Sequence, residues 1–135
     1  LNPEQQHGLY EVSLYPGRGL LIPRMVFEKI GLFEENKLPH YMADYDFTLQ
    51  ARKAGFKVLC NYDAPVYTYP EESGDFKNRK SKNLKRYVNH LFGIKGGGNL
   101  KNYTIYVLRN CPSYLIPISL ISGYLRRIIG FWIKG

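Results

Sequence analysis

The sequence predicts a mixed α/β fold for residues 1–75, followed by a helical tail over residues 76–135. Short alternating or apolar runs between glycine and proline predict strands in the first part, and apolar residues at helical spacing dominate the second. The charge changes sign between them. Residues 1–75 carry seven basic and eleven acidic side chains, a net charge of −4. Residues 76–135 carry twelve basic and no acidic side chains, a net charge of +12, so the whole chain has a net charge of +8.

The first expected elements flank a turn. Residues 10–15 alternate apolar and polar side chains, residues 20–22 form a short apolar run, and turn residues 16–19 lie between them. We therefore expect a hairpin or a bent strand. Pro23 suits the first turn of a helix, and Gly31 is a natural residue just after its end.

A connecting loop over residues 32–40 leads to the next expected helix, residues 43–54. Basic residues in its last turn interact favourably with the helix dipole, and Gly55 is expected to end the helix. Two apolar segments, residues 56–60 and 65–69, are then expected as strands.

The tail is expected to be helical and to associate with a membrane. Residues 81–92 and 99–110 have helical periodicity with basic faces, and residues 111–125 are all uncharged before Arg126-Arg127. A membrane-spanning helix needs about 18 to 20 consecutive apolar residues. We therefore expect an amphipathic helix on an anionic membrane surface, with a terminal helix packed on a protein core as the alternative.

Composition excludes several classes of protein. A chain of 135 residues has the length of one domain, and 44% hydrophobic and 15% aromatic residues exclude a disordered tail. Cys60 and Cys111 have no cysteine or histidine at ligand spacing, which argues against a disulfide framework and a zinc site. The chain begins at Leu1 without a leader or an initiator methionine, so we expect a fragment.

Two carboxylates, Asp44 and Asp46, lie at the start of the helix expected at residues 43–54. Free backbone N–H groups and the helix dipole favour an ionised Asp there, which can act as a base or a ligand. Residues i and i+2 point about 200° apart on a helix, so we expect one to face a reactant and the other to hold structure. Helix capping and metal binding by Asp-x-Asp are the alternatives.

Three blocks of the sequence resemble a known family. They are residues 17–24, residues 27–33, and the pair 44–47 with 53–58. In order and spacing they resemble the acceptor-side half of family 2 glycosyltransferases with the GT-A fold, most closely the rhamnosyltransferase-like branch. The resemblance covers about residues 8–75 and implies a partial GT-A domain, a mixed short sheet with helices, followed by a membrane-associated tail.

The resemblance also implies roles for individual residues. Asp44 falls on the general base that deprotonates the acceptor hydroxyl. The implied substrate-binding residues lie on the glycine turn, the following loop and the second acidic position: Gly17, Arg18, Gly19, His40, Tyr41 and Asp46. Gln50 stands where many members have Arg, so an ion pair between that position and the acidic motif is not expected here.

The donor side is expected to lie outside this chain. Members of the family hold the donor diphosphate and a divalent metal, Mg²⁺ or Mn²⁺, with an Asp-x-Asp at the end of a nucleotide-binding half. Nothing before Gly8 corresponds to that half. We therefore expect most metal ligands to be absent and the chain alone to be inactive.

The resulting hypothesis is a fragment of an inverting, hexosyltransferase-type glycosyltransferase of bacterial cell-surface polysaccharide synthesis. It would transfer sugar from a nucleotide-sugar donor to a glycan or lipid-linked acceptor at the cytoplasmic face of the cell membrane. One alternative is a non-enzymatic, basic membrane-surface or partner-binding module. Another is nucleic-acid binding, which the apolar run at residues 115–125 disfavours, because such a run has a role at a bilayer and none on nucleic acid.

Overall fold

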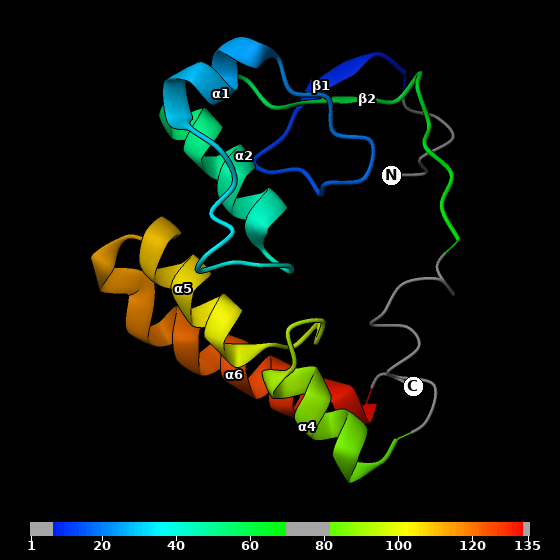
Figure 1. Cartoon of the computed structure of the whole chain (residues 1–135), viewed down its shortest axis with the longest axis vertical. Coiled ribbons are helices and arrows are strands. Elements are labelled where there is room, and N and C mark those ends of the chain that lie inside the picture. Colours follow the sequence, from blue (N-terminus) through cyan, green and yellow to red (C-terminus); the bar gives the residue numbers. More distant parts are fainter. Residues whose placement is uncertain (1–6, 70–81, 134–135) are drawn as a thin grey trace. The chain divides into compact units, whose positions relative to one another are not determined.

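A computed structural model describes residues 7–69 and 82–133 (Figure 1). Within this part, a two-stranded sheet and five α-helices form a mixed α/β structure, which confirms the expected class. The described residues divide into two compact units. The first unit comprises residues 7–33 and 44–68, and the second comprises residues 34–43, 69 and 82–133.

The sheet of the first unit joins β1 (Leu9–Glu11) to β2 (Leu59–Asn61) in antiparallel register, with Tyr10 opposite Cys60. A backbone hydrogen bond of 2.9 Å from Val12 N–H to the Val58 carbonyl continues the pairing beyond the strands. The edge of β1 is thus paired with a segment about 50 residues away in sequence.

Two expected strands do not form. Residues 20–22 and 65–69 are described, but neither joins the sheet. The prediction of a hairpin around residues 16–19 was therefore wrong, because β1 pairs with β2 instead. Residues 20–22 contribute side chains to an apolar pocket rather than to a ladder.

Two short helices enclose the core of the first unit. Pro23 caps the start of α1 (Arg24–Ile30), and Gly31 ends it with φ of 82° and an N–H bond to the Phe27 carbonyl. In α2 (Ala43–Lys53), Phe47 and Ala51 face Val26 of α1 in the buried core. The two helices therefore form as expected, because their apolar residues share one core.

The described residues of the second unit form four helical segments: α4 (Leu84–Phe92), α5 (Leu100–Asn110), the 3₁₀ helix η3 (Ser113–Leu115) and α6 (Ile116–Ile133). Figure 1 shows α5 and α6 side by side and antiparallel. The side chains of Asn83 and Asn99 cap α4 and α5 by accepting backbone N–H bonds of 2.9 Å.

Specific contacts attach α6 to its neighbours. The Tyr103 hydroxyl donates to the Ser119 carbonyl at 2.8 Å, and the Thr104 and Tyr124 hydroxyls are 2.6 Å apart. Phe131 is buried, and its ring lies 5.2 Å from that of Tyr87 on α4. These contacts fix α6 against α5 and α4.

The loop before α2 also belongs to the second unit. Glu34 accepts a hydrogen bond of 3.3 Å from Arg109 of α5 and lies 3.6 Å from Lys37. Leu38 is buried. The ion pair with Arg109 therefore attaches residues 34–43 to α5, although 75 residues separate its two partners in sequence.

Helix α6 is longer than the uncharged run at residues 111–125 suggested, because it continues through Arg126 and Arg127 without a break. Within Ser113–Ile133, a stretch of 18 residues has a mean hydropathy of 1.2, and the segment is long and apolar enough to cross a membrane. Most of this segment is not buried in the structure. Large apolar side chains are exposed along it: Ile118, Ile121, Leu125, Ile129, Trp132 and Ile133.

Candidate functional site

The Asp44 carboxylate is held against the glycine turn of the first unit. Its Oδ2 accepts a 2.7 Å hydrogen bond from the Gly17 N–H, and its Oδ1 accepts a 2.9 Å bond from the Tyr45 N–H. Asp44 lies in the first turn of α2 and is partly exposed. The structure therefore brings together two of the residues singled out from sequence, with the carboxylate oriented by both of its oxygens.

The contact with Gly17 is one of three along the same face of α2. The Thr48 hydroxyl accepts a 3.2 Å bond from the Tyr15 N–H, and Arg52 Nη1 donates a 3.3 Å bond to the Ser13 carbonyl. Residues four apart share a helix face, and residues two apart share one side of an extended chain. Asp44, Thr48 and Arg52 thus hold the extended segment 13–17 along α2, antiparallel to the helix.

Sequence reasoning missed this role of Thr48 and Arg52. Both follow Asp44 at helical spacing, i+4 and i+8, and this pattern was the available signal. The Thr48 hydroxyl also donates to the Asp44 carbonyl at 3.0 Å. The Arg52 guanidinium bonds to a backbone carbonyl, so its role is to attach the extended segment.

Asp46 differs from Asp44 in its environment. Only 2% of its surface is exposed, whereas Asp44 is partly open to solvent. The two side chains lie two positions apart in the first turn of α2, on different sides of the helix. Asp46 is therefore placed among packed residues, and Asp44 is the carboxylate that a solute can reach.

The glycine turn has one glycine that the backbone requires. Gly19 has φ of 70°, and a Cβ atom there would lie 2.7 Å from Val66 Cγ2. Gly17 has no positive φ, and a Cβ on it would make ordinary contacts of 3.5 Å with Asp44. Between them, the exposed Arg18 donates a 3.2 Å bond from Nη1 to the Thr68 hydroxyl.

His40 and Tyr41 lie in the loop of the second unit, with ring centroids 4.7 Å apart. His40 is exposed, and Tyr41 is partly buried. The residue that follows them, Met42, has φ of 76°, a backbone conformation that residues other than glycine rarely adopt. This strained position, directly before the acidic motif, carried no signal in the sequence.

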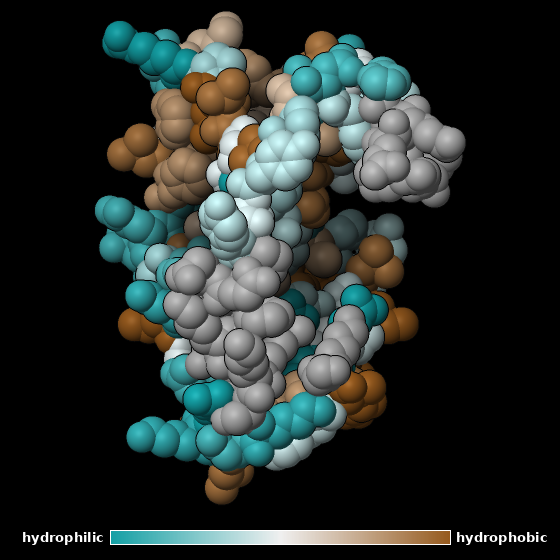
Figure 2. Space-filling view, turned by 90° about the vertical axis from the view of Figure 1, so that its right-hand side faces the viewer, coloured by the Kyte–Doolittle hydropathy of each residue, from teal (hydrophilic) through white to brown (hydrophobic). Residues whose placement is uncertain are grey.

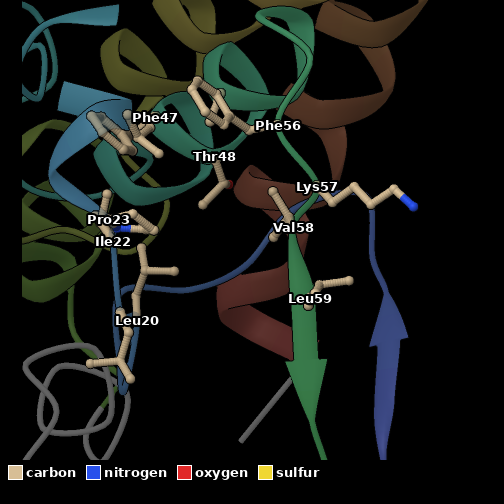
Figure 3. A pocket seen from close by; sticks show the side chains of 12 residues that line it. Leu20, Ile22, Pro23, Phe47, Thr48, Phe56, Lys57, Val58 and Leu59 are labelled. Carbon is tan, nitrogen blue, oxygen red and sulfur yellow. The ribbon is translucent and has the colours of Figure 1, made fainter. Parts of the chain in front are cut away.

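A small apolar pocket lies over the core of the first unit, with a volume of about 90 Å³ (Figure 3). Leu20 and Ile22 line it from the extended segment after the glycine turn, and Val58 and Leu59 line it opposite. The Lys57 amine extends away from it (Figure 3). Thr48 is the polar side chain in its wall, so the pocket suits an apolar group and not a reaction.

The Tyr15 hydroxyl and the Cys60 sulfur lie within hydrogen-bond distance, 3.8 Å apart. Hydrogen bonding of the protonated phenol to this sulfur and, second, burial of the hydroxyl raise the pKa of Tyr15 above its ordinary value. Within residues 7–69 and 82–133, no three His, Cys, Asp or Glu side chains gather as a metal site.

Comparison of the chain with protein-family models, with curated proteins and with solved structures found no match.

Proposed function

We propose that this chain is the acceptor-side part of an inverting glycosyltransferase that uses a nucleotide-sugar donor, with Asp44 as the general base. The observation that supports this most directly is the Asp44 carboxylate, accessible in the first turn of α2 and bonded to the Gly17 N–H. The contact joins two of the blocks that resemble GT-A glycosyltransferases. A base beside a glycine turn suits the approach of a sugar hydroxyl.

In this mechanism Asp44 accepts the proton of the acceptor hydroxyl while the hydroxyl oxygen attacks the anomeric carbon of the donor. A new C–O bond forms, the bond from the anomeric carbon to the diphosphate breaks, and the nucleoside diphosphate leaves with the electron pair. In-line attack inverts the anomeric configuration. Each carboxylate oxygen accepts one backbone N–H and keeps a further lone pair for the acceptor.

The remaining residues of the proposed site would bind substrate. Arg18 lies exposed between the two turn glycines and presents a guanidinium that can bind sugar hydroxyls or phosphate. His40 and Tyr41 are proposed substrate contacts of the loop before α2. The metal and the donor diphosphate would be held by residues other than these.

We also propose that the second unit associates with the cytoplasmic face of a bacterial membrane and places the enzyme near a glycan or lipid-linked acceptor. Exposed apolar side chains along α6 support this, as do the twelve basic residues of the tail. Figure 2 shows hydrophobic side chains at the surface beside hydrophilic ones. Such a surface matches the boundary between lipid headgroups and acyl chains.

The decisive experiment is a transfer assay on the protein expressed from the complete reading frame that contains these 135 residues. A panel of nucleotide sugars is supplied with a membrane extract as acceptor, and released nucleoside diphosphate and labelled glycan are measured. We expect transfer with one donor class, lost in Asp44→Asn. Binding to vesicles without transfer would support the non-enzymatic membrane module, and equal binding to RNA would support the nucleic-acid alternative.

A further inference from the structure

A cavity of about 230 Å³ lies in the second unit, between the loop after α4 and the last turns of α6. Its lining combines two arginines, a histidine, a phenylalanine and three glycines: Arg126, Arg127, His90, Phe131, Gly97, Gly98 and Gly130. Among residues 7–69 and 82–133, no acidic side chain lines it. The cavity is therefore a basic one with much of its wall formed by bare backbone.

The two arginines carry charge that the described residues do not neutralise. Arg127 is held in place, because its guanidinium lies 3.5 Å over the Tyr103 ring and its Nη1 donates to the Gly123 carbonyl at 3.1 Å. Neither Arg126 nor Arg127 pairs with a carboxylate in the part of the chain that the structure describes. Two cations that line one cavity favour the binding of an anion there, and guanidinium groups match phosphate oxygens well.

The loop lines the same cavity with Gly97 and Gly98, which have no side chain. Gly96 N–H bonds to the Gly93 carbonyl at 2.9 Å and Asn99 N–H to the Gly96 carbonyl at 3.0 Å, while the N–H groups of Gly97 and Gly98 have no acceptor among the described residues. A Cβ at Gly98 would overlap the His90 ring. Glycine is thus needed there, and it leaves backbone N–H groups at a cavity wall, an arrangement that binds anions elsewhere.

A shallow apolar cavity of about 280 Å³, wide open to solvent and lined by residues of α6 alone, adjoins the basic one. Leu125, Ile129 and Ile133 line it from successive turns of α6, and it shares Arg126 and Gly130 with the basic cavity. A Cβ at Gly130 would meet no atom within 4 Å. The missing side chain of Gly130 therefore leaves open space where the two cavities meet.

We propose that the two cavities form one site for a membrane lipid that carries a phosphate group. The phosphate binds Arg126, Arg127 and the loop glycines, and an aliphatic chain lies along Leu125, Ile129 and Ile133. This inference rests on the proposed membrane association of the second unit. A basic cavity joined to an apolar groove fits a phosphate attached to hydrocarbon better than a free phosphate, which would leave the groove empty.

Calorimetric titration of the whole chain with three soluble probes tests the site. Dihexanoyl phosphatidic acid carries both parts, inorganic phosphate carries only the anion, and dihexanoylglycerol carries only the chains. Because linked groups bind together, we expect the lipid phosphate to bind at least about tenfold more tightly than either part. Equal binding of inorganic phosphate would overturn the lipid assignment, and no binding of any probe would overturn the site.

Variants separate the two parts of the site. Arg126→Gln removes one phosphate ligand, and Gly130→Leu fills the open space; each is expected to weaken binding of the lipid phosphate about tenfold or more. Lys85→Gln is the matched control, since it removes the same charge from an exposed residue that lines neither cavity. Equal losses in Arg126→Gln and Lys85→Gln would show charge attraction without a site. Circular dichroism establishes that the variants fold.

Sedimentation with phosphatidylglycerol vesicles distinguishes this inference from the proposed membrane association. The Gly130→Leu protein should still sediment, because it keeps its charges and gains an apolar side chain. Wild-type protein that binds the short lipid but not vesicles would leave the site in place and contradict the membrane proposal. Wild-type protein that sediments with vesicles but binds no short lipid would support the membrane proposal and contradict the lipid site.

Discussion

The backbone N–H of Gly17 donates a 2.7 Å hydrogen bond to Oδ2 of Asp44, 27 residues further along the chain. The same carboxylate accepts the N–H of Tyr45 through its other oxygen. Asp44 thus has a structural role as well as the proposed catalytic one, and experiments must separate the two.

Asp44→Asn is expected to lower turnover of the full-length enzyme by about 10² to 10⁴ with donor affinity nearly unchanged, as loss of a general base does. The amide has one acceptor oxygen for two N–H donors, so we also expect about 1 kcal/mol of lost stability. Asp46→Asn should reduce turnover less. Turnover, donor dissociation constants and urea denaturation of both variants are measured side by side.

Thr48→Val is the structural control for this prediction. It removes the bonds to Tyr15 N–H and to the Asp44 carbonyl but leaves the carboxylate intact. We expect a similar loss of stability and a much smaller loss of turnover. If Thr48→Val and Asp44→Asn reduced turnover equally, Asp44 would be a structural residue only. If both Asn variants lost metal-dependent donor binding, Asp-x-Asp would be a metal site.

The 135-residue chain by itself is expected to bind nucleotide sugars no more tightly than millimolar, which corresponds to about −4 kcal/mol. The resemblance assigns the diphosphate and metal site to a nucleotide-binding half. Calorimetry with a donor panel and Mn²⁺ measures this. A micromolar dissociation constant for any donor would show that residues of this chain form the donor site.

Gly19→Ala is expected to destabilise the first unit by about 2 kcal/mol or more, combining left-handed backbone strain with overlap of Val66. Gly55→Ala is the control, because Gly55 has φ of 94° but no atom within 4 Å of a Cβ. It should show the strain of a positive φ alone, about 1 kcal/mol. Gly17→Ala should be nearly neutral. Urea denaturation ranks the three, and equal effects of Gly19→Ala and Gly55→Ala would exclude the Val66 contact as a cause.

Exposed apolar residues of α6 are expected to determine vesicle binding. The double variant Ile118→Ser, Ile121→Ser should weaken sedimentation with phosphatidylglycerol vesicles by at least about tenfold, since each buried isoleucine contributes roughly 1.5–3 kcal/mol. Binding should also fall with added salt, because the tail is basic. Met25→Ser, with 61% exposure against 63% for Ile121, is the control in the first unit. Loss of binding in the control alone would place the membrane contact elsewhere.

Stability at alkaline pH should depend on Tyr15. Its pKa is raised above the ordinary 10.0, so the folded state holds the phenol proton more tightly than the unfolded state. This contribution is complete below pH 10.0 and is lost as the pH rises through the folded-state pKa. The unfolding free energy of wild type should therefore fall more steeply above that pH than that of Tyr15→Phe. Cys60→Ala should reduce the difference, and identical pH profiles of all three proteins would contradict the prediction.

Local sequence signals determined the helices of this protein. Gly31 and Gly55 end α1 and α2 at the expected residues, since each has the positive φ that glycine adopts freely. Of the three residues expected to be buried in α2, Phe47 and Ala51 are buried and Leu49 is only partly buried. The mixed α/β class followed from these same short-range patterns, which need no knowledge of remote neighbours.

Pairing between remote segments was decided by the tertiary structure alone. Strand β1 pairs with β2 and not with residues 20–22, because strand pairing depends on which edges meet and not on local propensity. The hydrogen bonds of Asp44, Thr48 and Arg52 form only because the extended segment 13–17 lies along α2. Asp44 and Asp46 are the same residue type in the same helical turn. Packing in the folded chain buries Asp46 and leaves Asp44 partly exposed.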